Sequence, residues 1–184
     1  EFGTCTVTLP ELRKARVGVV FATVMIRIDP AGSYANTGMR TQPQCYAMGR
    51  GHAAYYEILE RTGDARIIRT AADLAEVASD WRERADARRI GIVMAMESAD
   101  PIVDAEQVSH WHEIGLRCVS LSHYGTGAYA HGTGTEGGLL PRARDLLAAL
   151  KAARILVDAT HLTDQGLWEL LEAYDGPLIA SHHN

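Results

Sequence analysis

The chain has 184 residues, with 18 Lys and Arg residues against 23 Asp and Glu residues, and carries a formal net charge of −5. Hydrophobic residues make up 47% and charged residues 22%, which is typical of one globular domain, here residues 1–184, and excludes a disordered chain or a small disulfide scaffold. The mild acidity and the lack of a Lys- or Arg-rich run argue against a nucleic-acid partner. No apolar run reaches the roughly 18 residues that a membrane span needs.

The three cysteines, Cys5, Cys45 and Cys118, are far apart and form no Cys-x-x-Cys pair. Scattered cysteines in odd number indicate reduced thiols, so we expect a cytoplasmic protein. The chain begins without Met and ends within the run SHHN. Neither end resembles a natural terminus, which leaves open a targeting segment upstream.

Apolar runs alternate with segments of helical periodicity along most of the chain. In chain order the sequence predicts a strand at 17–28, a helix at 46–61, a helix at 70–81, a strand at 90–96, a helix at 104–114, a strand at 118–122, a helix after Pro141, a strand at 155–159, a helix after Thr163 and a strand at 177–180. Strands separated by helices predict a parallel α/β fold. Two architectures remain open, a doubly wound sheet and a (β/α)8 barrel, and the barrel requires more chain than is present.

A metal-binding or acid–base side chain follows each of the last four predicted strands. These residues are Glu97, His123, His161 and His182. Active sites of parallel barrels are built at the carboxyl ends of several strands, so we expect these side chains to meet. Imidazoles with a carboxylate suit zinc or a similar divalent ion. Asp158 could hold a metal-ligating side chain in place through a hydrogen bond. However, strand parity places Asp158 on the face of the sheet opposite His161, so a structural role is equally expected.

The other histidines carry less weight. His131 lies in a Gly-rich loop over the predicted site and is a candidate substrate contact. Solvated or structural roles are expected for His52, His110 and His112, and His183 should point away from His182.

A second motif suggests a different cofactor. The segment GTGTEG at 132–137 matches Gly-x-Gly-x-x-Gly, and Asp158 follows 21 residues after Gly137, near the spacing of a dinucleotide-binding fingerprint. However, the segment does not follow its strand directly, and Glu136 places a carboxylate where pyrophosphate would lie. An NAD-binding oxidoreductase is therefore the least favoured alternative.

Several segments together resemble the membrane (renal) dipeptidase family of zinc peptidases. They are MESAD at 96–100, GLRCVSLSH at 115–123, GGLL at 137–140, VDATH at 157–161 and PLIASHHN at 177–184. The resemblance implies a (β/α)8 TIM barrel, of which this chain supplies about strands two to six, and a site with two Zn²⁺ ions. It also implies hydrolysis of the amide bond of a small dipeptide substrate by a metal-activated water.

The resemblance assigns a role to each residue at the strand ends. Glu97 corresponds to the carboxylate that bridges both metal ions, and His161 and His182 correspond to ligands of the second ion. His123 corresponds to the histidine that contacts the substrate and polarises the bond under attack, which makes Glu97 and His123 the expected catalytic residues.

The sequence also departs from the family pattern. The His-x-Asp pair that holds the first metal ion in the family does not occur here, and a substrate-binding Arg and a late acidic residue would lie beyond residue 184. Thr160 and His183 replace serines of the family pattern. We therefore expect the 184-residue chain alone to be inactive, and a non-catalytic barrel relic is the main alternative. Open sheet edges would invite pairing with a second copy, so a homodimer is among the expected assemblies.

Overall fold

The computed structural model describes residues 7–32, 38–84 and 86–182, so Cys5 and His183 lie outside the described residues. The strands are β1 (Val19–Val24), β2 (Arg27–Ile28), β3 (Gly38–Met39), β4 (Ala65–Ile67), β5 (Ile90–Met96), β6 (Leu116–Ser120), β7 (Leu156–Asp158) and β8 (Leu178–Ile179). The helices are α1 (Leu9–Lys14), α2 (Gln42–Arg61), α3 (Ala71–Glu83), α4 (Gln107–Ile114), α5 (Ala143–Ala152) and α6 (Asp164–Ala173).

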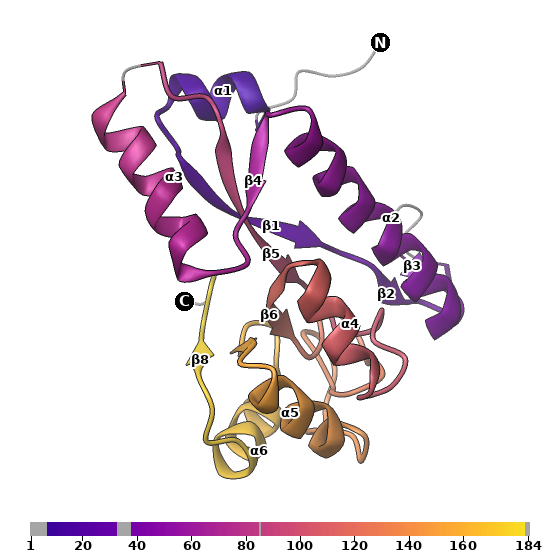
Figure 1. Ribbon diagram of the computed structural model, residues 1–184. Helices are drawn as coiled ribbons and strands as arrows, with labels where there is room; N and C mark the ends of the chain where they lie inside the picture. Colours follow the sequence, from indigo (N-terminus) through magenta and orange to yellow (C-terminus); the bar gives the residue numbers. More distant parts are fainter. Residues whose placement is uncertain (1–6, 33–37, 85, 183–184) are drawn as a thin grey trace.

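The main sheet is entirely parallel and its strand order decides between the two architectures. Its strands run β1-β5-β6-β7-β8, and β4 pairs with the first residues of β5 (Figure 1). From β1 through β5 to β8 the order follows the chain without the reversal of a doubly wound sheet, and the short β4 is the exception. A parallel sheet whose main strands succeed one another in chain order is the arrangement of a (β/α)8 barrel, so the predicted barrel-type fold is confirmed.

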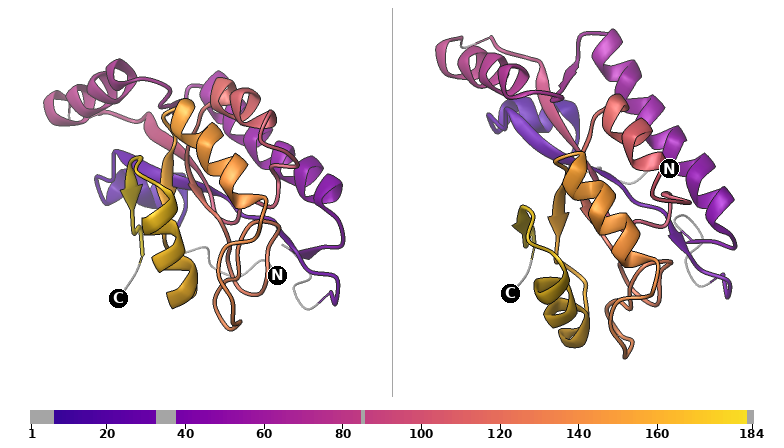
Figure 2. Two further views of the ribbon diagram at one scale, coloured as in Figure 1. Left: turned by 90° about the horizontal axis from the view of Figure 1, so that it is seen from below. Right: turned by 60° about the horizontal axis from the view of Figure 1, so that its bottom comes forward.

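The helices cover one face of this sheet. Figure 2 shows α2, α4 and α5 following one another along that face. Their apolar sides meet the strands in a core that includes Met94, Trp111, Leu146 and Leu150, all at most 1% exposed. A smaller cluster around Trp81 joins α3 to the start of β5. Among the described residues no helix is both long and apolar enough to span a membrane.

Several element boundaries differ from the sequence prediction by a few residues, and two of the differences have a clear local cause. The expected strand 17–28 is divided, because β1 ends at Val24 while β2 pairs with β3 in a separate sheet. Asp100 holds this second piece, since its carboxylate accepts a hydrogen bond from the Ile28 amide at 2.6 Å. Helix α2 begins at Gln42 rather than at 46, because the Thr41 hydroxyl caps it by accepting from the Gln44 amide.

Candidate metal centre

The four side chains predicted at the strand ends come together at one edge of the sheet. Glu97 directly follows β5, and three histidines lie shortly after β6, β7 and β8. All three rings direct Nε2 toward the same carboxylate oxygen. The distances from Glu97 Oε1 are 3.0 Å to His161, 3.3 Å to His182 and 3.4 Å to His123. The Nε2 atoms of His161 and His182 are themselves 3.1 Å apart.

The Nδ1 atom of His182 identifies its tautomer. Ser181 Oγ lies 2.5 Å from Asp158 Oδ2 and 2.7 Å from His182 Nδ1. An ionised carboxylate only accepts hydrogen bonds, so the single hydroxyl proton of Ser181 goes to Asp158. Ser181 Oγ then accepts from His182 Nδ1–H. The neutral ring of His182 is left with a lone pair on Nε2, which faces Glu97.

His161 is held in the same tautomer by a different loop. Thr133 Oγ1 lies 3.4 Å from the His161 carbonyl, to which it donates, and 3.1 Å from His161 Nδ1, from which it accepts. His161 Nε2 therefore also carries a lone pair. The backbone of His161 has φ = 72°, a left-handed conformation that costs a non-glycine residue about 1–3 kcal/mol and is typical of functional positions.

His123 differs from the other two histidines in its Nδ1 partner. That atom lies 3.5 Å from a guanidinium nitrogen of Arg27. Burial and the neighbouring His161 lower the pKa of His123 to about 4, with a further contribution from Arg27 and against the opposing charge of Glu97. The ring is therefore neutral near pH 7.

The donor set fits a zinc ion. Ligand atoms about 2.0–2.1 Å from zinc in a tetrahedral site lie roughly 3.3–3.4 Å from one another, close to the distances between Glu97 Oε1 and the imidazole nitrogens. The ligand atoms of Glu97, His161 and His182 lie 3.0 to 3.3 Å from one another, and His123 lies in the same group, with its ligand atom within 4.8 Å of those of Glu97 and His161. Two imidazole lone pairs and a carboxylate oxygen repel one another at such distances, and a cation between them removes that repulsion.

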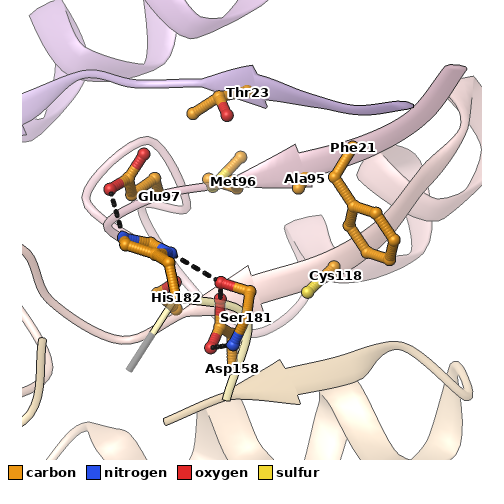
Figure 3. A pocket seen from close by; sticks show the side chains of 10 residues that line it. Phe21, Thr23, Ala95, Met96, Glu97, Cys118, Asp158, Ser181 and His182 are labelled. Atoms are coloured by element: carbon orange, nitrogen blue, oxygen red, sulfur yellow. Dashed lines mark hydrogen bonds and ion pairs between the residues drawn. The ribbon is translucent and has the colours of Figure 1, made fainter. Parts of the chain in front are cut away.

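A cavity of about 370 Å³ adjoins the cluster and is lined by residues of β1, β5, β6 and β7. Glu97, His182, Ser181 and Asp158 line it together with Phe21 (Figure 3). The parity prediction for Asp158 is wrong, because β7 ends at Asp158 and the chain turns before His161, so strand alternation does not reach the histidine. Asp158 lies behind His182 and contacts it through Ser181.

Two residues hold the loops that surround the cluster. Asp100, fully buried, accepts from the Ala128 amide of the Gly-rich loop at 2.7 Å and from the Ile28 amide of β2. Gly132 lets the same loop approach His123, since a Cβ atom there would lie 1.9 Å from the His123 carbonyl oxygen. The loop thus delivers Thr133 to His161.

Other candidates lie away from the Glu97 cluster. The His131 ring packs against Gly137, and its Nδ1 lies 3.1 Å from Thr126 Oγ1. Its contact with substrate stays a prediction. His52 lies on α2, and His110 and His112 lie on α4.

The dinucleotide interpretation lacks its structural context. The segment 132–137 joins no strand directly to a helix, because α5 begins only at Ala143. Thr163 Oγ1 donates to the Gly137 carbonyl at 2.6 Å, which ties this segment to the start of α6. The glycine pattern serves loop packing here, and nothing in the arrangement favours a dinucleotide.

Sequence reasoning missed three supporting residues, Arg27, Thr133 and Ser181. Each contacts a histidine through Nδ1. Ser181 carried a local signal, since it directly precedes His182. Arg27, on β2, and Thr133, in the Gly-rich loop, lie 96 and 28 residues away from their histidines in sequence. No local pattern connects such distant positions.

Comparison with known proteins matches this chain to one family. The model of the membrane dipeptidase family, peptidase family M19, matches residues 1–184. Dipeptidase tcpJ of Claviceps purpurea is 22% identical over 181 residues, which are 96% of this chain and 41% of that protein. A metallopeptidase structure from Rhodobacter sphaeroides, liganded with a phosphinate mimic of L-Ala-D-Ala, is 22% identical with a TM-score of 0.82, covering all of this chain and 57% of its own.

A further solved structure gives the same fold. The probable dipeptidase PvdM from Pseudomonas aeruginosa is 17% identical with a TM-score of 0.77, over 99% of this chain and 46% of that protein. The chain thus spans about half the length of the proteins that it matches. The family model covers every residue, and the sheet order and TIM-barrel neighbours agree with it: the chain belongs to the membrane dipeptidase family, peptidase family M19.

Proposed function

We propose that this chain forms the metal-binding part of a hydrolase that cleaves the amide bond of dipeptides. Glu97, His161 and His182 are the ligands, and zinc is the metal. The observation that carries the proposal is the meeting of two imidazole lone pairs with one oxygen of Glu97, at distances of 3.0 to 3.3 Å. Each ligand histidine is anchored through Nδ1 by a hydroxyl group, as metal-binding histidines usually are by a polar partner.

The metal ligands and His123 have different roles in the proposed hydrolysis. When bound, zinc supplies Lewis acidity and makes water acidic enough to attack an amide at neutral pH. His123 is the catalytic residue that contacts the substrate. It donates a hydrogen bond from Nε2 to the carbonyl oxygen and stabilises the negative charge that develops there. Its pKa of about 4 keeps it neutral, so it acts as a donor and not as a general acid.

A complete site would hold two Zn²⁺ ions with Glu97 as the bridge. One oxygen of Glu97 faces His182 and the other points away from it (Figure 3), which is the arrangement that bridging needs. Within the described residues, the grouped ligand atoms all lie around Glu97 Oε1. They provide for one ion, and the ligands of the other would come from residues outside this set.

A dipeptide substrate is supported by the family and by one relative. The family is described as membrane dipeptidases, and the Rhodobacter sphaeroides relative binds a mimic of L-Ala-D-Ala. We therefore propose short, uncharged dipeptides as substrates, with a D-residue accepted in the second position.

Metal removal and a panel of peptides test this function. Hydrolysis of L-Ala-L-Ala, L-Ala-D-Ala and L-Ala-L-Ala-L-Ala is followed with the protein as purified, after treatment with a chelator, and after zinc is restored. In a protein that carries this chain together with the ligands of the second ion, we expect cleavage of dipeptides, its loss on chelation and its recovery with zinc. The 184-residue chain alone should bind zinc without cleaving dipeptides. Metal content per chain is measured on the same samples.

His110→Ala is the matched control, since this exposed histidine of α4 lies outside the cluster. It should change neither zinc content nor turnover. Cleavage that survives complete removal of metal would contradict the proposal. Tight zinc binding without cleavage of any peptide, in a protein that carries the ligands of both ions, would instead favour the non-catalytic barrel.

A further inference from the structure

Arg27 is a buried cation at the edge of the proposed active site. The residue is 3% exposed and lies on β2, the second part of the predicted strand 17–28. One guanidinium nitrogen donates to the Tyr124 carbonyl and lies 3.5 Å from His123 Nδ1. The same group therefore holds the backbone that follows His123 and faces its ring.

The direction of protons at this contact is fixed by the chemistry of arginine. A guanidinium carries five N–H donors, has no acceptor and does not lose its charge in proteins. It can approach His123 Nδ1 favourably only where that atom presents a lone pair. In a neutral imidazole the proton must then reside on Nε2.

We propose that Arg27 is a positioning residue that fixes His123 in the tautomer protonated at Nε2. The two ligand histidines have the opposite tautomer, because their Nδ1 atoms donate to Ser181 and Thr133. All three imidazoles direct Nε2 toward Glu97, but the protonation of that atom differs. In His161 and His182 it presents a lone pair, and in His123 it presents an N–H group. Arg27 thereby excludes His123 from metal ligation and makes it a hydrogen-bond donor to the substrate. The tautomer itself follows from the contact with Arg27, whereas the hydrogen bond to the substrate rests on the proposed function.

The tautomer is measured directly by long-range ¹H–¹⁵N correlation spectra of ¹⁵N-histidine-labelled protein with zinc bound. His123→Gln identifies the His123 signals. We expect a pyridine-type nitrogen at Nδ1 and a pyrrole-type nitrogen at Nε2 of His123, and the reverse at His161 and His182. A pyrrole-type Nδ1 at His123 in the unmodified protein would overturn the proposal without any variant.

Glu97 also draws a proton toward Nε2 of His123, so its effect must be separated from that of Arg27. The spectra are recorded for Glu97→Gln and for Glu97→Gln/Arg27→Met. We expect the single variant to keep the pyridine-type Nδ1 and the double variant to show averaged, mixed tautomers. Loss of the pyridine-type signal in Glu97→Gln alone would assign the tautomer to Glu97 and overturn the role of Arg27.

Kinetics of Arg27→Met and Arg27→Lys complete the test. Lysine keeps a buried donor without an acceptor and should retain the tautomer and most of the turnover. Arg27→Met should lower kcat about tenfold, at the low end of losses for such supporting residues, with KM and zinc content nearly unchanged. A shift of tautomer in a protein that cleaves no dipeptide would leave the inference intact and refute the proposed function. An unchanged His123 tautomer in Glu97→Gln/Arg27→Met would refute the inference and leave the proposed function intact.

Discussion

Two carboxylates in this molecule are each surrounded by polar groups, and they differ in whether those groups can all donate hydrogen bonds to the carboxylate. Asp73, in the first turn of α3, accepts from the Arg66 guanidinium, from the Thr70 hydroxyl at 2.9 Å and from the Arg69 and Thr70 amides at 3.0 and 2.8 Å. Each of these groups carries a proton and donates it in a hydrogen bond to the Asp73 carboxylate. Glu97 faces three imidazoles, two of which present lone pairs.

The difference separates a structural cluster from a functional one. Burial alone would raise the pKa of Asp73, but its hydrogen bonds outweigh burial and lower that pKa to about 2. The Asp73 cluster is complete within the chain. The Glu97 cluster brings a carboxylate oxygen and two lone pairs together and needs a cation to make that arrangement favourable. A carboxylate at the strand ends whose neighbours cannot all donate hydrogen bonds to it is therefore a better indicator of a metal site than the number of polar groups.

Removing Glu97 should have the largest effect. Glu97→Gln keeps the size of the side chain but removes the negative charge that attracts a cation, so we expect loss of bound zinc. Metal ions contribute several kcal/mol to the transition state, so turnover should fall by about 10³-fold or more. Zinc content and dipeptide hydrolysis are the measurements. Glu106→Gln, an exposed glutamate before α4, is the control, and equal zinc content in both variants would refute the contrast with Asp73.

His123→Ala should leave metal binding intact and impair chemistry. This change removes a hydrogen bond to the developing oxyanion, for which losses of about 10²–10³ in kcat are usual. Zinc content is measured beside kcat and KM. A variant that loses its zinc would show that His123 is a ligand, and the distinction drawn from the Nδ1 partners would then be wrong.

Ser181→Ala and Asp158→Asn should weaken zinc binding without abolishing it. Both changes disturb the hydrogen bonds that hold His182 with its lone pair toward the metal, and such supporting contacts are worth about 10–100-fold in metal affinity. Competition with a chromophoric zinc chelator measures the affinity. Ser109→Ala, an exposed serine of α4, should bind zinc like the unmodified protein. Unchanged affinity in Ser181→Ala would mean that His182 is oriented by other contacts.

The sequence predicted the Glu97 cluster better than the contacts that support it. Glu97 and His123 could be placed because parallel strands end at a common edge, so that consecutive strand ends become neighbours in space. Asp158 was misplaced because strand parity ends where β7 ends. Thr133 and Arg27 could not be found, since their positions depend on loops that Asp100 and Gly132 fold against the site. Contacts between distant loops leave no periodic signal in a sequence.

Asp73 offers the smallest expected effect and the cleanest control on the comparison, because it should change stability and leave chemistry alone. Its side chain is 11% exposed, and its pKa falls from 3.8 to about 2 on folding. A depressed pKa contributes stability that is complete above about pH 4 and is lost as the pH falls toward 2. Allowing for solvent screening, we expect Asp73→Asn to reduce the free energy of unfolding by about 1–2 kcal/mol at pH 7. Urea denaturation at pH 7 and at pH 3 should show this difference in the free energy of unfolding shrinking in acid, while turnover per folded molecule stays constant.

Asp86→Asn, whose partner Arg84 is also exposed, is the control and should unfold like the unmodified protein. A loss of turnover in Asp73→Asn at full folding would place this cluster with the functional one and break the comparison.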